Sequence, residues 1–282
     1  MIPSVFISHG SPMLPLGDSP ARRFLADLAA RLPRPEAILA ISAHWETDAP
    51  TVNSVAVNDT IHDFRGFPEP LYALRYAAPG SPALAERVRG LLRDAGFECR
   101  VDARRGLDHG AWVPLLLTYP EADIPVAQLS VQSRLGPAHH LELGRALAPL
   151  RDERTLVLGS GSFTHNLHEY FAGAEDVPEP EWVAGFADWF DRVLAEGRTQ
   201  DLLDYRRLAP AAQRNHPTEE HLLPLFVALG AAGPRPHVER LHRSADRGVL
   251  RLDAYAFEGA AQARTGRPLP GAGTRERPFS GT

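Results

Sequence analysis

The sequence contains a single cysteine, Cys99, among its 282 residues. One thiol excludes an intramolecular disulfide and a zinc site built from cysteines, and it is typical of a protein from a reducing compartment. We therefore expect a cytoplasmic location. If the protein binds a metal ion, imidazole and carboxylate groups must hold it.

Long apolar runs and an excess of basic charge are also missing. No uninterrupted apolar stretch reaches the length of a membrane span, and residues 1–10 lack the basic and apolar regions of a secretory signal. The formal net charge is −5, whereas a nucleic-acid partner favours a basic face. We expect no membrane and no nucleic acid among the partners, and a monomer or a small homo-oligomer.

Short apolar runs alternate along the chain with segments of helical periodicity. The runs are rich in β-branched residues and are typical of buried strands. Strands that alternate with helices predict an α/β fold, specifically a three-layer α/β/α sandwich with a mostly parallel central sheet. The four clearest runs lie at residues 4–7, 37–42, 124–131 and 155–161.

The domain organisation follows from composition. Residues 1–262 show no linker-like change of composition and no internal repeat, so we expect one catalytic α/β domain there. Residues 263–282 are rich in Gly, Pro, Arg and Thr and offer little to bury, which predicts a loose C-terminal tail.

Histidines follow three of the predicted strands. His9 comes just after the run at 4–7, His44 after 37–42, and His165 after 155–161. Because the carboxyl ends of parallel strands meet at one edge of a sheet, we expect these imidazoles to lie close together. Three imidazoles at one edge are hard to explain by packing alone. They predict a metal site.

His221 lies beside a predicted helix start. Thr218 is a suitable N-cap, which would place His221 in the first turn of the helix. The positive end of the helix dipole disfavours an imidazolium and leaves the neutral ring that a divalent metal requires. Glu219 and Glu220 are adjacent; either is a candidate carboxylate ligand, although partnership with the helix dipole is the simpler interpretation.

His109 lies, like His165, in a turn after a predicted strand. A redox-active iron site needs three protein ligands on one face and open positions for substrate and oxygen. It also needs a nearby base that is not a ligand, and histidine suits that role. The long loop at 58–76 carries several aromatic residues and is either a pocket wall or an ordinary surface loop.

Five short motifs around these histidines resemble one enzyme family. Taken in chain order, the motifs resemble those of the class III extradiol ring-cleaving dioxygenases, specifically the DOPA-dioxygenase-like branch of the LigB-type superfamily. The motifs are Ser8-His9-Gly10-Ser11-Pro12, Ser42-Ala43-His44-Trp45, Leu107-Asp108-His109-Gly110-Ala111-Trp112, Gly159-Ser160-Gly161 through His165-Asn166-Leu167, and His216-Pro217-Thr218 through His221-Leu222-Leu223-Pro224-Leu225.

The resemblance implies a division of roles among the histidines. It implies that His9, His44 and His221 are metal ligands. It also implies that His165 acts beside the metal as a base or as an additional ligand, with His109 lining the substrate pocket. In the protocatechuate-cleaving relatives the third ligand is a glutamate, whereas the matching position here is His221. Three imidazoles suit Zn(II) as well as Fe(II), so both metals stay open.

The activity implied is extradiol cleavage of a catechol, such as DOPA, with O2. Fe(II) would bring catechol and O2 together, His165 would move the proton of a phenolic hydroxyl, and His109 would hydrogen-bond the substrate. Two alternatives remain at this point. Three histidines on zinc also suit a hydrolase on the same scaffold, and some members of the superfamily bind metal without ring cleavage.

Overall fold

The computed structural model of the chain describes residues 1–174 and 177–259. Within these ranges, eight strands form one sheet in the order β4-β3-β5-β2-β6-β1-β10-β7. A short ribbon of two more strands, β8 (Ala245–Asp246) and β9 (Leu250–Arg251), lies outside it. The strands of the sheet are β1 (Ser4–Ser8), β2 (Ala37–Glu46), β3 (Thr51–Asn53), β4 (Arg100–Asp102), β5 (Val126–Val131), β6 (Thr155–Gly161), β7 (His237–His242) and β10 (Ala254–Glu258).

The centre of the sheet is parallel. β2 pairs in parallel with both β5 and β6, and β6 pairs in parallel with β1. Antiparallel pairs occur toward the edges, where β10 joins β1 to β7 and β3 joins β5. The carboxyl ends of β1, β2 and β6 therefore meet at one edge of the sheet, where ligands bind in open α/β folds.

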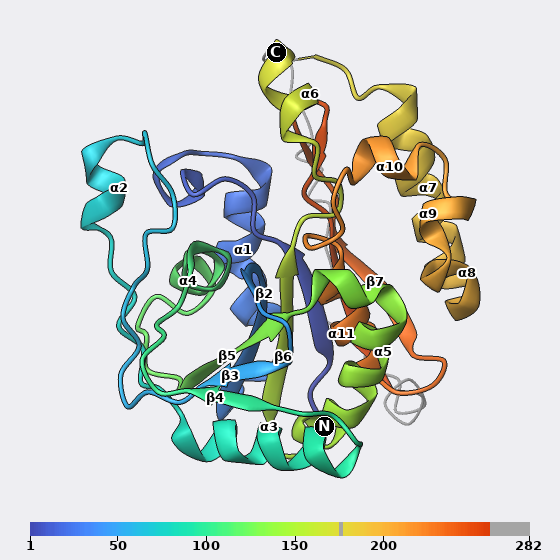
Figure 1. Cartoon of the computed structure of the whole chain (residues 1–282). Helices are drawn as coiled ribbons and strands as arrows, with labels where there is room; N and C mark the ends of the chain where they lie inside the picture. The colour runs from blue at the N-terminus through green and yellow to red at the C-terminus, as the bar shows by residue number, and fades with distance from the viewer. Residues whose placement is uncertain (175–176, 260–282) are drawn as a thin grey trace, which may run out of the picture.

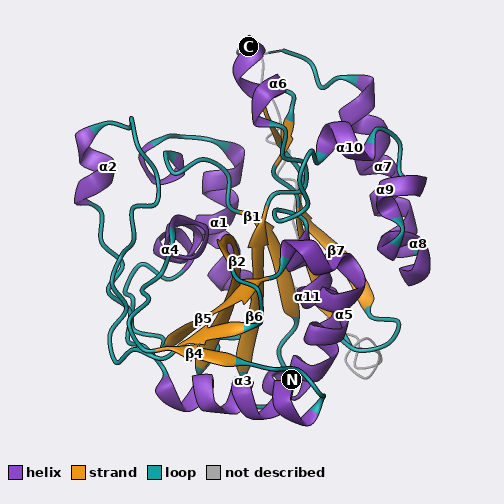
Figure 2. Cartoon of the chain, in the orientation of Figure 1, coloured by secondary structure: helices purple, strands orange, loops and turns teal. Residues whose placement is uncertain are grey.

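Alternation along the strands explains the three layers. In β2, Ile38 and Ala40 face one side of the sheet, and Leu39 and Ile41 face the other, all fully buried. A strand that is apolar on both faces must be covered on both, which is the usual state of parallel sheets. Figure 2 shows helices on both sides of the sheet.

The helices divide between the two faces. α1 and α4 cover one face and pack on the residues around Ile38, whereas α5 and α11 cover the other with α3 and α7 beside them (Figure 1). The expected three-layer α/β/α sandwich with a mostly parallel sheet is confirmed. The helices are α1 (Pro20–Arg31), α2 (Glu69–Ala73), α3 (Pro82–Asp94), α4 (His109–Thr118), α5 (Gly136–Leu147), α6 (Leu167–Ala172), α7 (Glu181–Ala195), α8 (Thr199–Leu203), α9 (Tyr205–Leu208), α10 (Ala212–Asn215) and α11 (Leu223–Ala231).

Local sequence fixes several helix starts. Ser19 and Ser81 accept a backbone N–H from the first turns of α1 and α3, and a proline follows each serine at the first helical position. This serine-proline order satisfies one orphan N–H and presets the helical backbone angle. No helix in the described part of the chain is long and apolar enough to cross a membrane.

The helix near His221 begins later than the sequence predicted. α11 starts at Leu223, and Leu222 occupies the N-cap position in place of Thr218. Pro224 explains the shift, because a proline lacks an N–H and fits only the first turn of a helix. His221 therefore lies in the turn before α11, and its prediction as a first-turn residue was wrong.

Two domain predictions are not tested by this structure. The single-domain boundary at residue 262 and the loose tail at 263–282 lie outside the described residues. The cytoplasmic location and the oligomeric state also stay predictions.

Candidate metal centre

Strand ends position the first two histidines. His9 directly follows β1, and its N–H donates to the carbonyl of Gly161 at the end of β6. His44 lies inside β2, which continues to Glu46 through an irregularity in its pairing with β5. The predicted strand ended at Ser42. His44 lies within this irregular stretch, near the carboxyl end of β2.

His221 reaches the same edge through its backbone. Its carbonyl accepts the N–H of Ser162 at 2.9 Å, which ties the turn before α11 to the end of β6. Gly161 makes this approach feasible, because a Cβ there would overlap the carbonyl oxygen of His221. Two segments some 60 residues apart in the chain thus meet at one point.

The Nε2 atoms of these three histidines converge. His9 Nε2 lies 3.0 Å from His44 Nε2, which lies 3.3 Å from His221 Nε2. The hydroxyl of Ser160 donates to the carbonyl of Gly110, so its oxygen accepts from His9 Nδ1. Because Nδ1 carries the proton, Nε2 of His9 offers a lone pair to the centre.

The same logic applies to His221. Its Nδ1 lies 2.9 Å from the carboxylate of Glu220, which only accepts hydrogen bonds when ionised. Nδ1 is therefore the protonated nitrogen, and Nε2 again offers a lone pair. Glu220, a candidate ligand in the sequence, accepts from Nδ1 of His221 and so orients that ring, as carboxylates next to metal sites commonly do.

Burial keeps the three rings neutral. Desolvation, followed by the neighbouring imidazoles, holds the pKa values of His9 and His221 well below the usual range. Burial likewise lowers the pKa of His44 to about 3. The Nε2 lone pairs of His9 and His221 both face His44 Nε2, which can donate a proton to at most one of them, whereas a single cation can accept all three lone pairs. The donor set therefore fits a divalent metal such as Fe(II) or Zn(II).

His109 is held by a carboxylate from the long loop. Asp63 accepts the backbone N–H of His109 at one oxygen and lies 2.9 Å from its Nδ1 at the other. Hydrogen bonds and charge from His109 lower the pKa of Asp63 against the opposing effect of burial. The Asp63 side chain is 22% exposed, and it fixes the ring with Nε2 left to the cavity.

His165 stacks on His221. The two ring centroids lie 3.4 Å apart with the planes inclined by 13°. Its backbone N–H donates to the carbonyl of Asn215, while burial lowers the pKa of its ring to about 4. A neutral imidazole beside the metal centre can accept a proton from a ligand at neutral pH.

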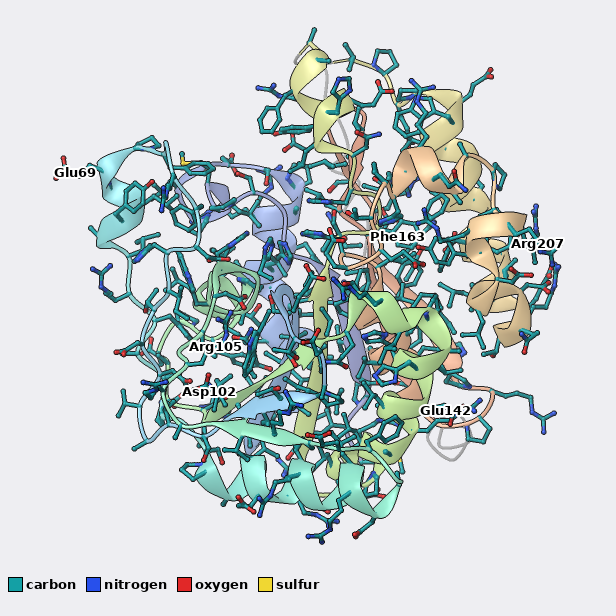
Figure 3. All side chains as sticks on the ribbon, in the orientation of Figure 1. Glu69, Asp102, Arg105, Glu142, Phe163 and Arg207 are labelled. Carbon is teal, nitrogen blue, oxygen red and sulfur yellow. The ribbon has the colours of Figure 1, made fainter. Side chains whose placement is uncertain are left out.

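A network of hydrogen bonds and an ion pair fixes the backbone at His44. Ser42 donates to the carboxylate of Asp108 at 2.6 Å and accepts the backbone N–H of His44. Arg105 pairs with the same carboxylate at 3.0 Å, and Figure 3 shows where it lies in the lower part of the molecule. A Cβ at Gly110 would collide with the hydroxyl of Ser42, so the motif around His109 needs a glycine there.

The imidazoles form the floor of a cavity of about 200 Å³. Its walls are largely apolar and come from the turn after β1, the 58–76 loop, α6 and β9. Phe67 belongs to these walls, as the pocket-wall interpretation of the long loop predicted. The lining residues are His9, Gly10, Ser11, Pro12, His44, Phe67, His109, Ser162, His165, Leu167, Tyr170, Phe171, His221 and Leu250.

All five histidines singled out in the sequence meet at this cavity. Sequence reasoning missed Ser160 and Asp63, which fix the rings of His9 and His109. Ser160 lies within a quoted motif, and its place on the strand adjacent to β1 was the available signal. Asp63 gave no signal, because its loop carries no periodicity that would predict its fold.

Comparisons with known proteins identify the family of this chain. Residues 3–248 match the model of the family described as the catalytic LigB subunit of aromatic ring-opening dioxygenase. The 4,5-DOPA dioxygenase extradiol of Beta vulgaris is 50% identical over 256 residues, which cover 89% of this chain and 95% of that protein. The protein of the same name from Escherichia coli K12 is 42% identical over 82% of this chain and 85% of its own length.

A solved structure shares the fold. The uncharacterized protein JW3007 from Escherichia coli K12 superposes with a TM-score of 0.76 at 33% identity, covering 91% of this chain and 99% of that one. The shared fold and the family match lead to one conclusion. The chain belongs to the family of catalytic LigB subunits of aromatic ring-opening dioxygenases, and it is an extradiol ring-cleaving enzyme.

Proposed function

We propose that this dioxygenase holds Fe(II) on His9, His44 and His221 and opens the ring of a DOPA-like catechol with O2. The observation that carries the proposal is the convergence of three neutral Nε2 atoms, 3.0 and 3.3 Å apart, on the floor of a small cavity. Two of these rings have their tautomers fixed by Ser160 and Glu220, which leaves the lone pairs inward.

The reaction favours Fe(II) as the metal. When bound, Fe(II) supplies a redox-active, electropositive centre that favours a deprotonated catechol and activates O2. Zn(II) suits the same three imidazoles but has no redox chemistry, so a zinc-loaded protein is expected to be inactive in ring opening. Family membership favours ring opening over the zinc hydrolase and the non-enzymatic metal-binding protein.

Two further histidines are assigned to proton transfer and orientation. His165, neutral and outside the three-nitrogen cluster, takes the proton of a catechol hydroxyl at a ring nitrogen and returns a proton as the ring opens. His109 hydrogen-bonds the substrate through Nε2 while Asp63 holds its Nδ1. Because Asp63 accepts from Nδ1, Nε2 is the acceptor for a substrate hydroxyl, and a fixed ring spends no binding energy on ordering it.

The test is oxygen consumption by protein loaded anaerobically with Fe(II) and then given DOPA or unsubstituted catechol. We expect O2 uptake together with a yellow ring-opened semialdehyde, and neither with the zinc-loaded control. Uptake with both metals would contradict the assignment of redox chemistry to the bound iron. No uptake with several catechols despite a filled site would contradict the proposed function.

A further inference from the structure

His216 is a buried histidine that the proposed reaction does not use. Its side chain is shielded from solvent and does not belong to the lining of the cavity. The rings of Phe186 and Tyr205 lie 5.6 and 6.3 Å from its ring, so its surroundings are largely aromatic. Burial lowers the pKa of His216 to about 4, so the ring is neutral at pH 7 and carries a single proton.

One hydrogen bond shows which nitrogen of His216 carries that proton. Nε2 lies 2.9 Å from the backbone carbonyl of Phe163. A carbonyl only accepts, so Nε2 is the donor and Nδ1 is a bare acceptor. Among the described residues, Nδ1 has no hydrogen-bond partner. The bond to Phe163 is therefore the one polar contact that this ring makes within the described chain.

Phe163 belongs to the segment at 162–166, which runs beside residues 214–221. Figure 3 shows Phe163 on the side of the molecule that carries α7 to α10. Two backbone hydrogen bonds of 2.9 Å join the two segments on either side of Phe163. They run from the N–H of Ser162 to the carbonyl of His221 and from the N–H of His165 to the carbonyl of Asn215. The bond from His216 lies between them and adds a side-chain link.

The ring of His165 depends on this backbone for its place. In the part of the chain that the structure describes, neither of its ring nitrogens has a hydrogen-bond partner. By contrast, a side chain holds Nδ1 of His9, of His109 and of His221. The ring of His165 is placed by its backbone and by the stack on His221, whose ring centroid lies 3.4 Å away. A shift of the backbone at residues 163–165 would therefore move this ring directly.

We propose that His216 is a positioning residue for the base: its hydrogen bond to Phe163 holds the backbone from which His165 stacks on His221. His216 itself belongs neither to the cavity lining nor to the three converging nitrogens. The inference rests on the proposed function for the role of His165 as base, whereas the stack of the two rings is open to a test without turnover. Because a misplaced base slows proton transfer and leaves the substrate contacts in place, the loss should fall on kcat and not on KM.

The experiment compares His216→Gln with His216→Met. The two new side chains are similar in length and volume, but only glutamine has an N–H to donate to the carbonyl of Phe163. Each protein is loaded with Fe(II) under nitrogen, and kcat and KM for DOPA are measured by oxygen uptake. For His216→Met we expect kcat to fall about 10–100-fold, the range known for partners that orient a site histidine, with KM and metal content unchanged. His216→Gln should retain most of the turnover.

Crystal structures of the variants supply a readout that does not depend on activity. His216→Gln should keep the ring centroids of His165 and His221 3.4 Å apart, and His216→Met should separate the two rings. His140→Met is the matched control, because His140 is also buried and bonded to backbone groups but lies outside the cavity lining. It should lower the urea midpoint of unfolding and leave both kcat and the stack unchanged.

A purely structural role for His216 predicts a different result. His216→Gln buries an amide oxygen, and His216→Met leaves the carbonyl of Phe163 without its donor, so that role predicts comparable losses of stability and turnover in both. Equal losses of kcat in the two variants would therefore overturn the proposal. His216→Phe is a second variant without the donor; if neither it nor His216→Met folds, His216 serves stability and the proposal is overturned too.

The two readouts separate this proposal from the proposed function. Full kcat and an intact stack in His216→Met would overturn the positioning role and leave the proposed function in place. If the rings separate in His216→Met but not in His216→Gln, while the parent protein turns over no catechol, the positioning of His165 is supported and the proposed function is contradicted.

Discussion

Buried histidines occur in two regions of this molecule with opposite bonding. His140, at the start of α5, uses both ring nitrogens within the protein: Nδ1 lies 2.7 Å from the carbonyl of Gly136, and Nε2 accepts the N–H of Gln132. At the carboxyl edge of the sheet, His9 and His221 have Nδ1 held by Ser160 and Glu220, while Nε2 faces other imidazoles.

The histidines of both regions are buried, so burial does not distinguish them. They differ in what Nε2 contacts: a backbone N–H in His140, and other imidazoles at the carboxyl edge of the sheet. Burial is the first cause of the low pKa in both regions, and His140 has a pKa of about 3 just as His44 does. A low pKa by itself therefore does not mark a metal site. A fixed Nδ1 proton combined with Nε2 atoms that converge on one point does.

The largest expected effect is the loss of a converging nitrogen. His44→Ala removes the Nε2 atom that lies within 3.3 Å of both other ligands. Metal affinity should fall by more than the roughly 10–100-fold that losing an orienting partner costs. Metal content after dialysis against a metal buffer measures it, and exposed His237→Ala is the control. Normal metal binding by His44→Ala would remove His44 from the ligand set.

The second prediction asks whether His165 is a metal ligand or a base. If it acts as base and not as ligand, His165→Ala should retain the metal and lose roughly 10²–10⁴-fold in turnover, the usual cost of a missing acid-base group. Metal analysis and oxygen uptake on one preparation give both quantities. Loss of metal together with activity would make His165 a fourth ligand.

The third prediction asks whether turnover depends on the orientation of His109, which Asp63 fixes. Asp63→Asn keeps one acceptor oxygen but presents an amide N–H to the second donor of His109, which should release the ring. We expect kcat to fall about 10–100-fold, the range known for partners that orient a site histidine, with unchanged metal content. Exposed Asp59→Asn is the control. Unaltered kcat would show that the ring needs no such anchor.

His140 should affect stability against acid and not catalysis. Its folded pKa, about 3, is below the unfolded value of 6.5, so the unfolded state binds more protons between these pH values. The stability that the neutral ring contributes is complete above pH 6.5 and is lost as pH falls toward 3. At pH 5 the loss is about 2 kcal/mol.

His140→Gln should therefore reduce the decline of unfolding free energy from pH 7 to pH 5 by about 2 kcal/mol, although it costs about 1–3 kcal/mol at pH 7 through lost hydrogen bonds. Urea unfolding at several pH values measures this. Oxygen uptake at pH 7 should be unchanged. An acid profile identical to that of the parent protein would place the sensitivity in the metal-site histidines instead.

The fold was largely predictable from local pattern. Apolar runs such as residues 37–42 predict strands buried on both faces, and Ser81 followed by Pro82 predicts a helix start. Both signals depend only on neighbours in the chain. Element boundaries were predicted less accurately. β2 passes through His44 where a strand end was expected, since a register irregularity depends on β5 and not on the sequence of β2.

The sequence by itself determined the α/β architecture and the presence of histidines at the strand ends, because strand and helix periods are local properties. Only the tertiary structure decided how those histidines are used. His221 reaches the centre through a hydrogen bond from Ser162, and Asp63 reaches His109 from a loop without periodicity. Tertiary packing also decided that residues of α6 line the same cavity as the histidines. These contacts join segments distant in the chain, whose approach depends on the whole sheet.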